Sequence, residues 1–400
     1  MRPRIGGVTK VLGICAILAF TFACQPPRIP GPTPQPAPVI DPAEVESVIF
    51  LVGDAGEARQ LTYPILPRLR DDVEWWAQHL DADSAVTVLF LGDIVYPLGM
   101  NPPGAPEYPA DSAVVMDQVM LVAGPYARER GTRGYFIAGN HDWGLEREWD
   151  GFLRLINLNN FLELARTATD ADVSLVPEAG TGGPYVVDIG AHIRLLLLDS
   201  AWWLLTSEAQ GGLLHDGVLK GIEEAMLTAG DREVMIAAHH PFKSGGPHGG
   251  EFSFWRTLGV RYLLARSGAV LQDVTSIPYR ELEWGLRDIF TRTGPPLAFL
   301  GGHEHSLQIL YATEPTDPTY SVVSGAASKI SSLGSGDGMQ FGQSSPGYMK
   351  LVIGKDGDIS LLVESGAREL ESCPSEAPAR EECMALGVAA FATVHTQRLR

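Results

Sequence analysis

Short apolar runs that end at a glycine or another small residue recur along the chain. Their length, their β-branched content and the turn residues that bound them are typical of buried strands. A glycine at the end of such a run allows the backbone to turn sharply. The predicted strands of this kind are 48–52, 86–91, 134–138, 234–238 and 297–300. Apolar residues at helical spacing lie between or beside them and predict helices over 63–80, 112–130, 149–168 and 213–229.

The order of these patterns predicts the fold class. A strand, a helix and a second strand follow one another in the first part of the chain, which is typical of a βαβ unit. Hairpins are more frequent later: we expect them at 185–189 with 193–198 and at 348–353 with 359–364, and a further strand at 320–324. We therefore predict an α/β domain over residues 44–365, with two mixed β-sheets packed face to face and helices outside.

The first 43 residues have the composition of a targeting segment followed by a linker. Three basic residues precede the apolar stretch 11–22, so residues 1–23 are predicted to be a signal peptide. Cys24 follows Ala23 in a manner that resembles a lipoprotein signal, and acylation of Cys24 would give a membrane anchor; ordinary cleavage and secretion is the alternative. Residues 24–43 are a Pro-rich tether, with eight prolines among residues 25–42. We expect an exported protein, either a periplasmic or surface lipoprotein of the cell envelope or a secreted protein.

Composition narrows the class of partner. Hydrophobic residues make up 45% and charged residues 20% of the 400 residues, which is typical of a globular protein. The formal net charge of −18 makes nucleic-acid binding through phosphate neutralisation unexpected.

In an exported protein, Cys373 and Cys383 are expected to form a disulfide in the C-terminal segment 366–400. Within this segment, 384–394 has apolar residues at helical spacing.

Metal-competent side chains follow five of the predicted strands. In α/β folds the functional groups gather at the carboxyl ends of the strands. Each of these polar positions taken alone fits a turn or cap residue, but five strand ends of the same kind indicate a metal site. The residues concerned are Asp54, Asp93 with Tyr96, Asn140 with His141, His239 with His240, and His303 with His305.

These five segments resemble those of the calcineurin-like binuclear metallophosphoesterases, and more narrowly those of the purple acid phosphatases. The superfamily usually begins with Asp-x-His, whereas this chain has Gly56 in place of the histidine and carries Tyr96 after Asp93 instead. The segments 303–308 and 324–326 are similar to those of the small, animal-type, tartrate-resistant enzymes. The resemblance covers about residues 45–365 and implies a four-layer metallophosphoesterase sandwich.

The resemblance also implies two metal ions and their ligands. The first metal would be bound by Asp54, Asp93, Tyr96 and His305. The second would be bound by Asp93, Asn140, His239 and His303, with Asp93 shared. A phenolate from Tyr96 favours Fe³⁺ at the first site and a purple colour, and the N/O ligands of the second site suit Fe²⁺, Zn²⁺ or Mn²⁺. His239 is preferred to His240 as ligand because it stands two residues before Pro241, as in the family.

Two histidines are candidates for proton donation to the leaving group. The first is His141, which Asp142 could orient; the second is His248, in the glycine-rich loop after His239, where the small family members have a histidine. Lys243 could steer phosphate or simply be solvated. Trp202 and Trp203 could line the site, although packing is the commoner role of tryptophan. No Gly-x-Ser-x-Gly motif indicates a serine nucleophile.

The function implied is that of an exported binuclear acid phosphatase. Such an enzyme hydrolyses small phosphomonoesters through a metal-activated hydroxide. A metallophosphoesterase that acts on phosphodiesters or nucleotides with other metals is the alternative. A non-catalytic surface lipoprotein is a more remote one, because it gives no reason for a complete set of ligands.

Overall fold

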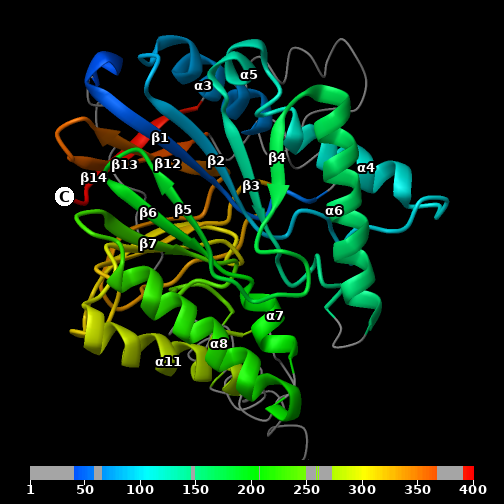
Figure 1. The fold of residues 1–400 in the computed structure, drawn as a ribbon, viewed down its shortest axis with the longest axis vertical. Coiled ribbons are helices and arrows are strands. Elements are labelled where there is room, and N and C mark those ends of the chain that lie inside the picture. Colours follow the sequence, from blue (N-terminus) through cyan, green and yellow to red (C-terminus); the bar gives the residue numbers. More distant parts are fainter. Residues whose placement is uncertain are drawn as a thin grey trace, which may run out of the picture.

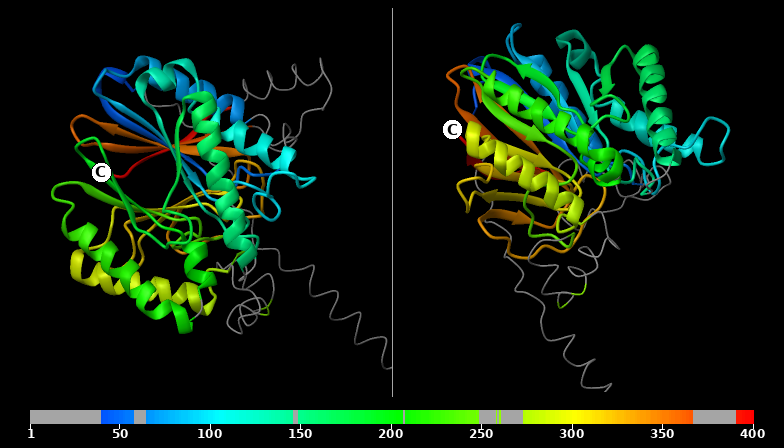
Figure 2. Two further views of the ribbon diagram at one scale, coloured as in Figure 1. Left: turned by 45° about the vertical axis from the view of Figure 1, so that its right-hand side comes forward. Right: turned by 60° about the horizontal axis from the view of Figure 1, so that its bottom comes forward.

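A computed structural model describes residues 40–57, 65–145, 149–206, 208–248, 258, 260, 273–366 and 391–400. The predicted signal peptide, most of the tether and the predicted Cys373–Cys383 disulfide lie outside the described residues. Two seven-stranded β-sheets are packed face to face with helices outside (Figures 1 and 2), which confirms the predicted fold class.

The first sheet combines a parallel half with an antiparallel half. Its strand order is β14-β13-β12-β1-β2-β3-β4, in which β1 to β4 are parallel and the remaining neighbours are antiparallel. The strands are β1 (Val45–Val52), β2 (Ala85–Leu91), β3 (Arg133–Ile137), β4 (Asp172–Leu175), β12 (Gly347–Gly354), β13 (Ile359–Ser365) and β14 (Ala392–Arg398).

The second sheet has a parallel centre and antiparallel edges. Its order is β11-β9-β10-β8-β7-β6-β5, and β6, β7, β8 and β10 are parallel. The strands are β5 (Tyr185–Ile189), β6 (Ile193–Leu197), β7 (Glu233–Ala237), β8 (Ala298–Gly301), β9 (Leu307–Tyr311), β10 (Tyr320–Ser324) and β11 (Met339–Gln343).

Helices cover the outer face of each sheet. A short 3₁₀ turn, η1 (Pro42–Glu44), precedes β1. Over the first sheet and beside β4 lie α3 (Ile65–His79), α4 (Tyr108–Val119), α5 (Pro125–Arg130) and α6 (Trp149–Thr169). Against the second sheet lie α7 (Ser200–Leu205), α8 (Glu208–Leu227) and α11 (Ile277–Thr293), as the lower part of Figure 1 shows.

The alternation of side chains along the strands divides the core into layers. Leu51 of β1 belongs to the apolar cluster between the sheets, together with Leu195 of β6. Its neighbour Phe50 points the other way and packs in the cluster that contains Leu69 and Val73 of α3. Because both faces of these strands are buried, their sequences are continuous apolar runs rather than alternating ones.

The structure differs from the sequence prediction at several elements. The predicted helix 112–130 is two helices: α4 ends at Val119, and α5 begins at Pro125 with Gly124 as its N-cap. β4, α7, α11, β9, β11 and β14 were not predicted. β14 pairs with β13, so the first sheet continues beyond residue 365, where we placed the end of the domain. Its residues 392–394 are strand, whereas the 384–394 pattern predicted a helix.

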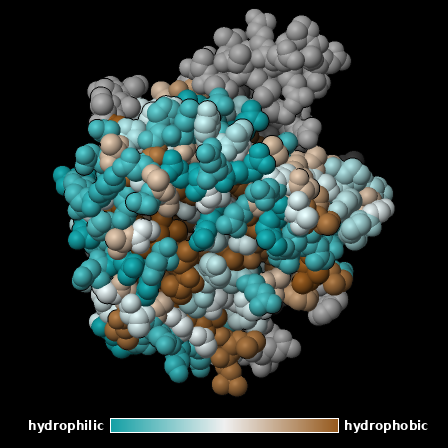
Figure 3. All heavy atoms as spheres, turned by 45° about the horizontal axis from the view of Figure 1, so that its top comes forward, coloured by the Kyte–Doolittle hydropathy of each residue, from teal (hydrophilic) through white to brown (hydrophobic). Residues whose placement is uncertain are grey.

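The surface in Figure 3 is mostly hydrophilic, with hydrophobic side chains in separate groups. Among the described residues, no helix combines the length and the apolar character that a membrane span requires.

Candidate metal centre

The candidate ligands gather at the carboxyl ends of parallel strands from both sheets. Asp54 and Asp93 each stand two residues beyond β1 and β2, and Asn140 stands three residues beyond β3. From the opposite sheet, His239 and His303 each stand two residues beyond β7 and β8. Since parallel strands point their carboxyl ends at the same edge, five loops that are distant in sequence meet there.

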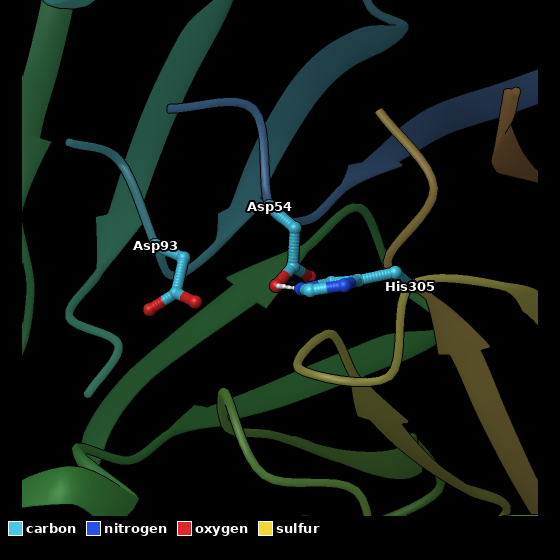
Figure 4. Close-up of side chains that lie close together, drawn as sticks. All are labelled: Asp54, Asp93 and His305. Carbon is cyan, nitrogen blue, oxygen red and sulfur yellow. Dashed lines mark ion pairs between the residues drawn. The ribbon is translucent and has the colours of Figure 1, made fainter. Parts of the chain in front are cut away.

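The first group of side chains consists of Asp54, Asp93, Tyr96 and His305. The Tyr96 hydroxyl lies 2.7 Å from Asp93 Oδ2, 3.0 Å from Asp54 Oδ1 and 3.3 Å from His305 Nε2. His305 Nε2 is 3.5 Å from Asp54 Oδ1 (Figure 4). The two aspartates and the histidine present atoms close enough together to hold one metal ion.

The second group consists of Asp93, Asn140, His239 and His303. His239 Nε2 lies 2.9 Å from Asn140 Oδ1, 3.2 Å from His303 Nδ1 and 3.3 Å from Asp93 Oδ1. His303 Nδ1 is 3.1 Å from Asn140 Oδ1. The structure thus brings together all seven residues that the sequence predicted as ligands, in two groups.

Asp93 belongs to both groups. Its Oδ2 faces Tyr96 in the first group and its Oδ1 faces His239 in the second. The carboxylate is almost fully buried, at 1% exposure, so it has no bulk water to neutralise its charge. One side chain therefore presents an oxygen to each of two neighbouring sets of ligands.

The backbone at the ligands adopts a conformation that most residues avoid. Asp54, Asp93 and His303 have positive φ angles of 60°, 54° and 66°. Strained backbone of this kind is concentrated at functional sites. Hydrogen bonds hold it: the His303 amide donates to Asp54 Oδ2 at 2.8 Å, and the His141 amide donates to Asp93 Oδ1 at 3.0 Å.

Further contacts orient the ligand rings. His239 Nδ1 donates to the Leu91 carbonyl at 2.8 Å, which directs Nε2 toward Asn140 and Asp93. His305 Nδ1 lies 3.2 Å from Ser331 Oγ, which leaves Nε2 toward the first group. Hydrogen bonds from the second ring nitrogen are usual for histidines that bind metals.

Burial and neighbouring charges shift the pKa values of several of these groups. Burial raises the pKa of Tyr96 well above its usual value, and the charges of Asp54 and Asp93 raise it further. Burial works against ionisation of Asp93 as well, but His239, His141 and hydrogen bonds outweigh it and lower the pKa to about 2. Burial and the neighbouring histidines lower the pKa of His303 well below its usual value, so His303 is a neutral imidazole, the form that binds metals.

Gly56 leaves no room for a side chain beside the loop that carries Tyr96. A Cβ added at Gly56 would lie 2.5 Å from the Ile94 carbonyl carbon and 2.6 Å from the Asp93 carbonyl oxygen. The Gly56 backbone also bonds to the loop after β2, donating to Asp93 O and accepting from Tyr96 N. A side chain at position 56 would push this loop away. The Tyr96 hydroxyl, carried by the same loop, adds an oxygen to the first ligand group.

His141 lies at the entrance of the centre, with 22% of its side chain exposed and Nε2 3.9 Å from Asp93 Oδ2. Asp142 does not orient it: His141 Nδ1 lies 2.6 Å from the Pro97 carbonyl instead. The buried Asp142 carboxylate accepts hydrogen bonds from the amides of Ile94, Val95 and Gly139. Its role is therefore to join the loops that carry Asp93 and Asn140.

His248 lies on the other side of the second group. Its ring centroid is 4.5 Å from that of His303, and 26% of its side chain is exposed. Its amide donates to Glu304 Oε1 at 2.9 Å, its carbonyl accepts from the Val274 amide, and Nδ1 lies 3.7 Å from Asp273 Oδ1. Both histidines predicted as proton donors thus flank the ligands.

The sequence did not predict that Glu304 and Asp273 contact His248. Asp273 belongs to no motif that could have indicated this contact. Glu304 stands between two candidate ligands, and its complete burial distinguishes it from a solvated acid.

Other candidates take structural positions. His240 Nδ1 lies 2.9 Å from Ser200 Oγ, and the His240 ring packs against that of His303, with centroids 4.4 Å apart. Lys243 is paired with Asp317 rather than directed at a substrate. Trp203 stacks on His215, with centroids 3.8 Å apart, and donates to the Pro278 carbonyl, so it packs between helices.

Comparisons with known proteins bear on the fold. Neither a protein-family profile nor a curated protein matches the sequence. Among solved structures, the chain is similar to GAP50, the anchor in the inner membrane complex of Plasmodium, with a TM-score of 0.54, 12% identity and 89% of each chain covered. It also matches the purple acid phosphatase PPD1 from yellow lupin seeds, with a TM-score of 0.47 and 15% identity, over 86% of this chain and 58% of the lupin chain. The similarity to GAP50 concerns the fold, which is two mixed β-sheets packed face to face with helices outside.

The residues present fit metal ions. Carboxylate, phenol, amide and imidazole atoms converge at 2.7–3.5 Å. Two imidazole nitrogens, of His239 and His303, face each other at 3.2 Å. A cation among such atoms offsets their mutual repulsion, and the mixed N/O donors suit a transition metal. The fold and this centre together define an α/β sandwich protein with a candidate metal site.

Proposed function

We propose that this protein is a phosphoric monoester hydrolase with two metal ions, an acid phosphatase of the purple type. The observation that carries the proposal is the Asp93 carboxylate, which presents one oxygen to each ligand group. We assign Fe³⁺ to the group that contains Tyr96, since a hard anionic donor favours a highly charged ion. Fe²⁺, Zn²⁺ or Mn²⁺ is assigned to the group that contains Asn140, His239 and His303.

When bound, two such cations would activate a water molecule and offset the charge on a phosphoryl group. The chain's own residues supply the rest. Asp93 and Asp54 bring negative charge into a buried site. His239 Nδ1 donates a hydrogen bond to the Leu91 carbonyl, His305 Nδ1 is hydrogen-bonded with Ser331 Oγ, and these contacts fix the two imidazoles. His141 and His248 lie on either side with partly exposed rings, where each can hold a proton near a departing alkoxide.

A purely binding role has less support. The name of the Plasmodium protein describes an anchor, but anchoring gives no reason for buried carboxylates and histidines to converge in strained loops. Buried polar groups of this kind are costly unless they bind something.

We further propose that the enzyme is exported and held at the cell envelope through Cys24, as the signal-like first 24 residues suggest.

The direct test is metal analysis and hydrolysis by the purified protein. We expect two metals per chain, including iron, and hydrolysis of 4-nitrophenyl phosphate that chelation abolishes and added metal restores. Bis(4-nitrophenyl) phosphate, measured in parallel, separates monoesterase from diesterase activity. Faster turnover of the diester would replace the proposal with its alternative. Full metal occupancy without hydrolysis of either compound would refute a phosphoesterase.

Replacement of His248 by alanine is expected to act through the leaving group. For an alkyl phosphate, whose alkoxide needs a proton as it departs, kcat is expected to fall by about 10²-fold. For 4-nitrophenyl phosphate, whose leaving group is stable as an anion, the loss should be much smaller.

His192→Ala is the matched control for this experiment. His192 precedes β6 at the opposite end of the strand from the metal centre and pairs with Glu46. His192→Ala should leave kcat unchanged for both the alkyl phosphate and 4-nitrophenyl phosphate. Equal losses for the two substrates in His248→Ala would show that His248 does not serve the leaving group.

A further inference from the structure

The segment after β10 contacts the first ligand group at three successive places. Ser328 Oγ donates to the Asp54 carbonyl and accepts from the Glu57 amide. Ser331 Oγ lies against His305 Nδ1, and its amide donates to the His305 carbonyl at 2.7 Å. Lys329 lies between these two serines, so both contacts help to place it, and its ammonium lies over the Tyr96 ring.

Lys329 Nζ lies 3.4 Å from the centroid of the Tyr96 ring. It also forms an ion pair with Glu57 Oε2 at 2.9 Å. Both charged side chains are largely covered, with 28% and 27% exposure. A cation over the face of an aromatic ring interacts with its π electrons, and the interaction is stronger where water is excluded.

We propose that Lys329 is a positioning residue that sets the electron-donor strength of Tyr96 toward the first metal, and that Glu57 limits its effect. The proposal rests on the ligand assignment within the proposed function and is independent of hydrolysis. The sequence position of Lys329, well beyond the last ligand, gave no indication of this contact.

The direction of the effect follows from the distances. The ammonium is centred on the ring, so it lies closer to the π electrons than to the far side of the hydroxyl, where the other ligand atoms converge. It therefore lowers the energy of the donor electrons more than that of a metal acceptor. The visible band of an iron–phenolate arises from transfer of an electron from the phenolate to the iron. Lys329 should therefore shift this band to shorter wavelength.

Three variants test this in iron-loaded protein, with iron content and the wavelength of maximum absorption measured on the same sample. Lys329→Met removes the charge at similar length, and we expect the band at longer wavelength. Lys329→Arg retains the charge and is the matched control, with the band near its original position. Glu57→Gln removes the counter-charge, and we expect the band at shorter wavelength. Opposite shifts from two neighbouring substitutions are not expected of a change in packing.

The outcomes separate this proposal from the phosphatase proposal. Opposite shifts together with absent hydrolysis would refute the enzyme and leave the role of Lys329 standing. An unchanged band in Lys329→Met with iron retained, or shifts of the same sign in Lys329→Met and Glu57→Gln, would overturn it. So would the absence of any visible band in the iron-loaded parent protein. If Lys329→Met does not fold, the sign of the Glu57→Gln shift alone decides.

Discussion

Replacing Asp93 by asparagine is expected to lower kcat/KM for 4-nitrophenyl phosphate by on the order of 10³-fold or more. The amide of asparagine offers one oxygen and no charge, so it cannot serve two cations at once. Asp93 Oδ2 faces the Tyr96 hydroxyl at 2.7 Å and Oδ1 faces His239 Nε2 at 3.3 Å, so the substitution weakens both groups of ligands. Metal content should therefore fall together with activity.

The comparison with Asp54→Asn makes this prediction specific. Asp54 Oδ1 faces only the first group, and its Oδ2 is used by the His303 amide. Asp54→Asn should lower the occupancy of the first site and spare the second, whereas Asp93→Asn should lower both. Asp188→Asn, at a surface acid paired with Arg194, controls for loss of one negative charge. An Asp93→Asn protein with two metals per chain and full activity would rule out a shared ligand.

The sequence was informative about the ligands because of how parallel strands are arranged. A buried strand is recognisable as an apolar run, and five of the seven ligands lie within two or three residues of the carboxyl end of a strand, such as Asp93 after β2 and His303 after β8. Short loops leave little freedom in where such side chains can point. Once the parallel parts of two sheets face each other, the carboxyl ends of their strands meet at one edge.

The supports of the ligands depend on contacts between segments that no local pattern connects. Ser331, Lys329 and Asp273 each reach the centre from loops whose sequences read as ordinary turns. Their roles follow only from tertiary packing, such as the 3.4 Å between Lys329 Nζ and the Tyr96 ring. Asp142 illustrates the same limit. The sequence suggested that Asp142 orients its neighbour His141, but its carboxylate instead accepts hydrogen bonds from buried backbone amides.

Some missed elements did carry a signal. Helix α11 begins with Ser276 as a side-chain cap and Pro278 near its first position, and Leu282, Leu286 and Ile289 follow at helical spacing. Strand β14 carried none: six of its seven residues are partly buried or exposed polar and small side chains, and it is a strand because β13 offers an edge. Helix signals are local, whereas an edge strand is defined by its neighbour.

The second large effect is expected from Tyr96→Phe. The substitution removes the only atom that Tyr96 contributes to the first group, and leaves the Asp54 and Asp93 carboxylates without a hydroxyl donor between them. We expect the visible band of the iron-loaded protein to disappear. The metal content should fall from two ions toward one per chain, because the first site loses its iron. The apo protein should also lose about 1.5–3 kcal/mol of unfolding free energy, the usual contribution of a hydrogen bond to a charged group.

Tyr348→Phe provides a control that separates stability from metal binding. Tyr348 is also fully buried and donates its hydroxyl to a carboxylate, Asp72 Oδ2, at 2.8 Å, but it lies on β12 beneath α3. The two substitutions remove the same atom and a hydrogen bond of the same kind, so their unfolding free energies in urea should fall by similar amounts. Only Tyr96→Phe should lose the band. If the band and the iron survive in Tyr96→Phe, the phenol is not a ligand, and the glycine at position 56 leaves the first site with Asp54, Asp93 and His305 alone.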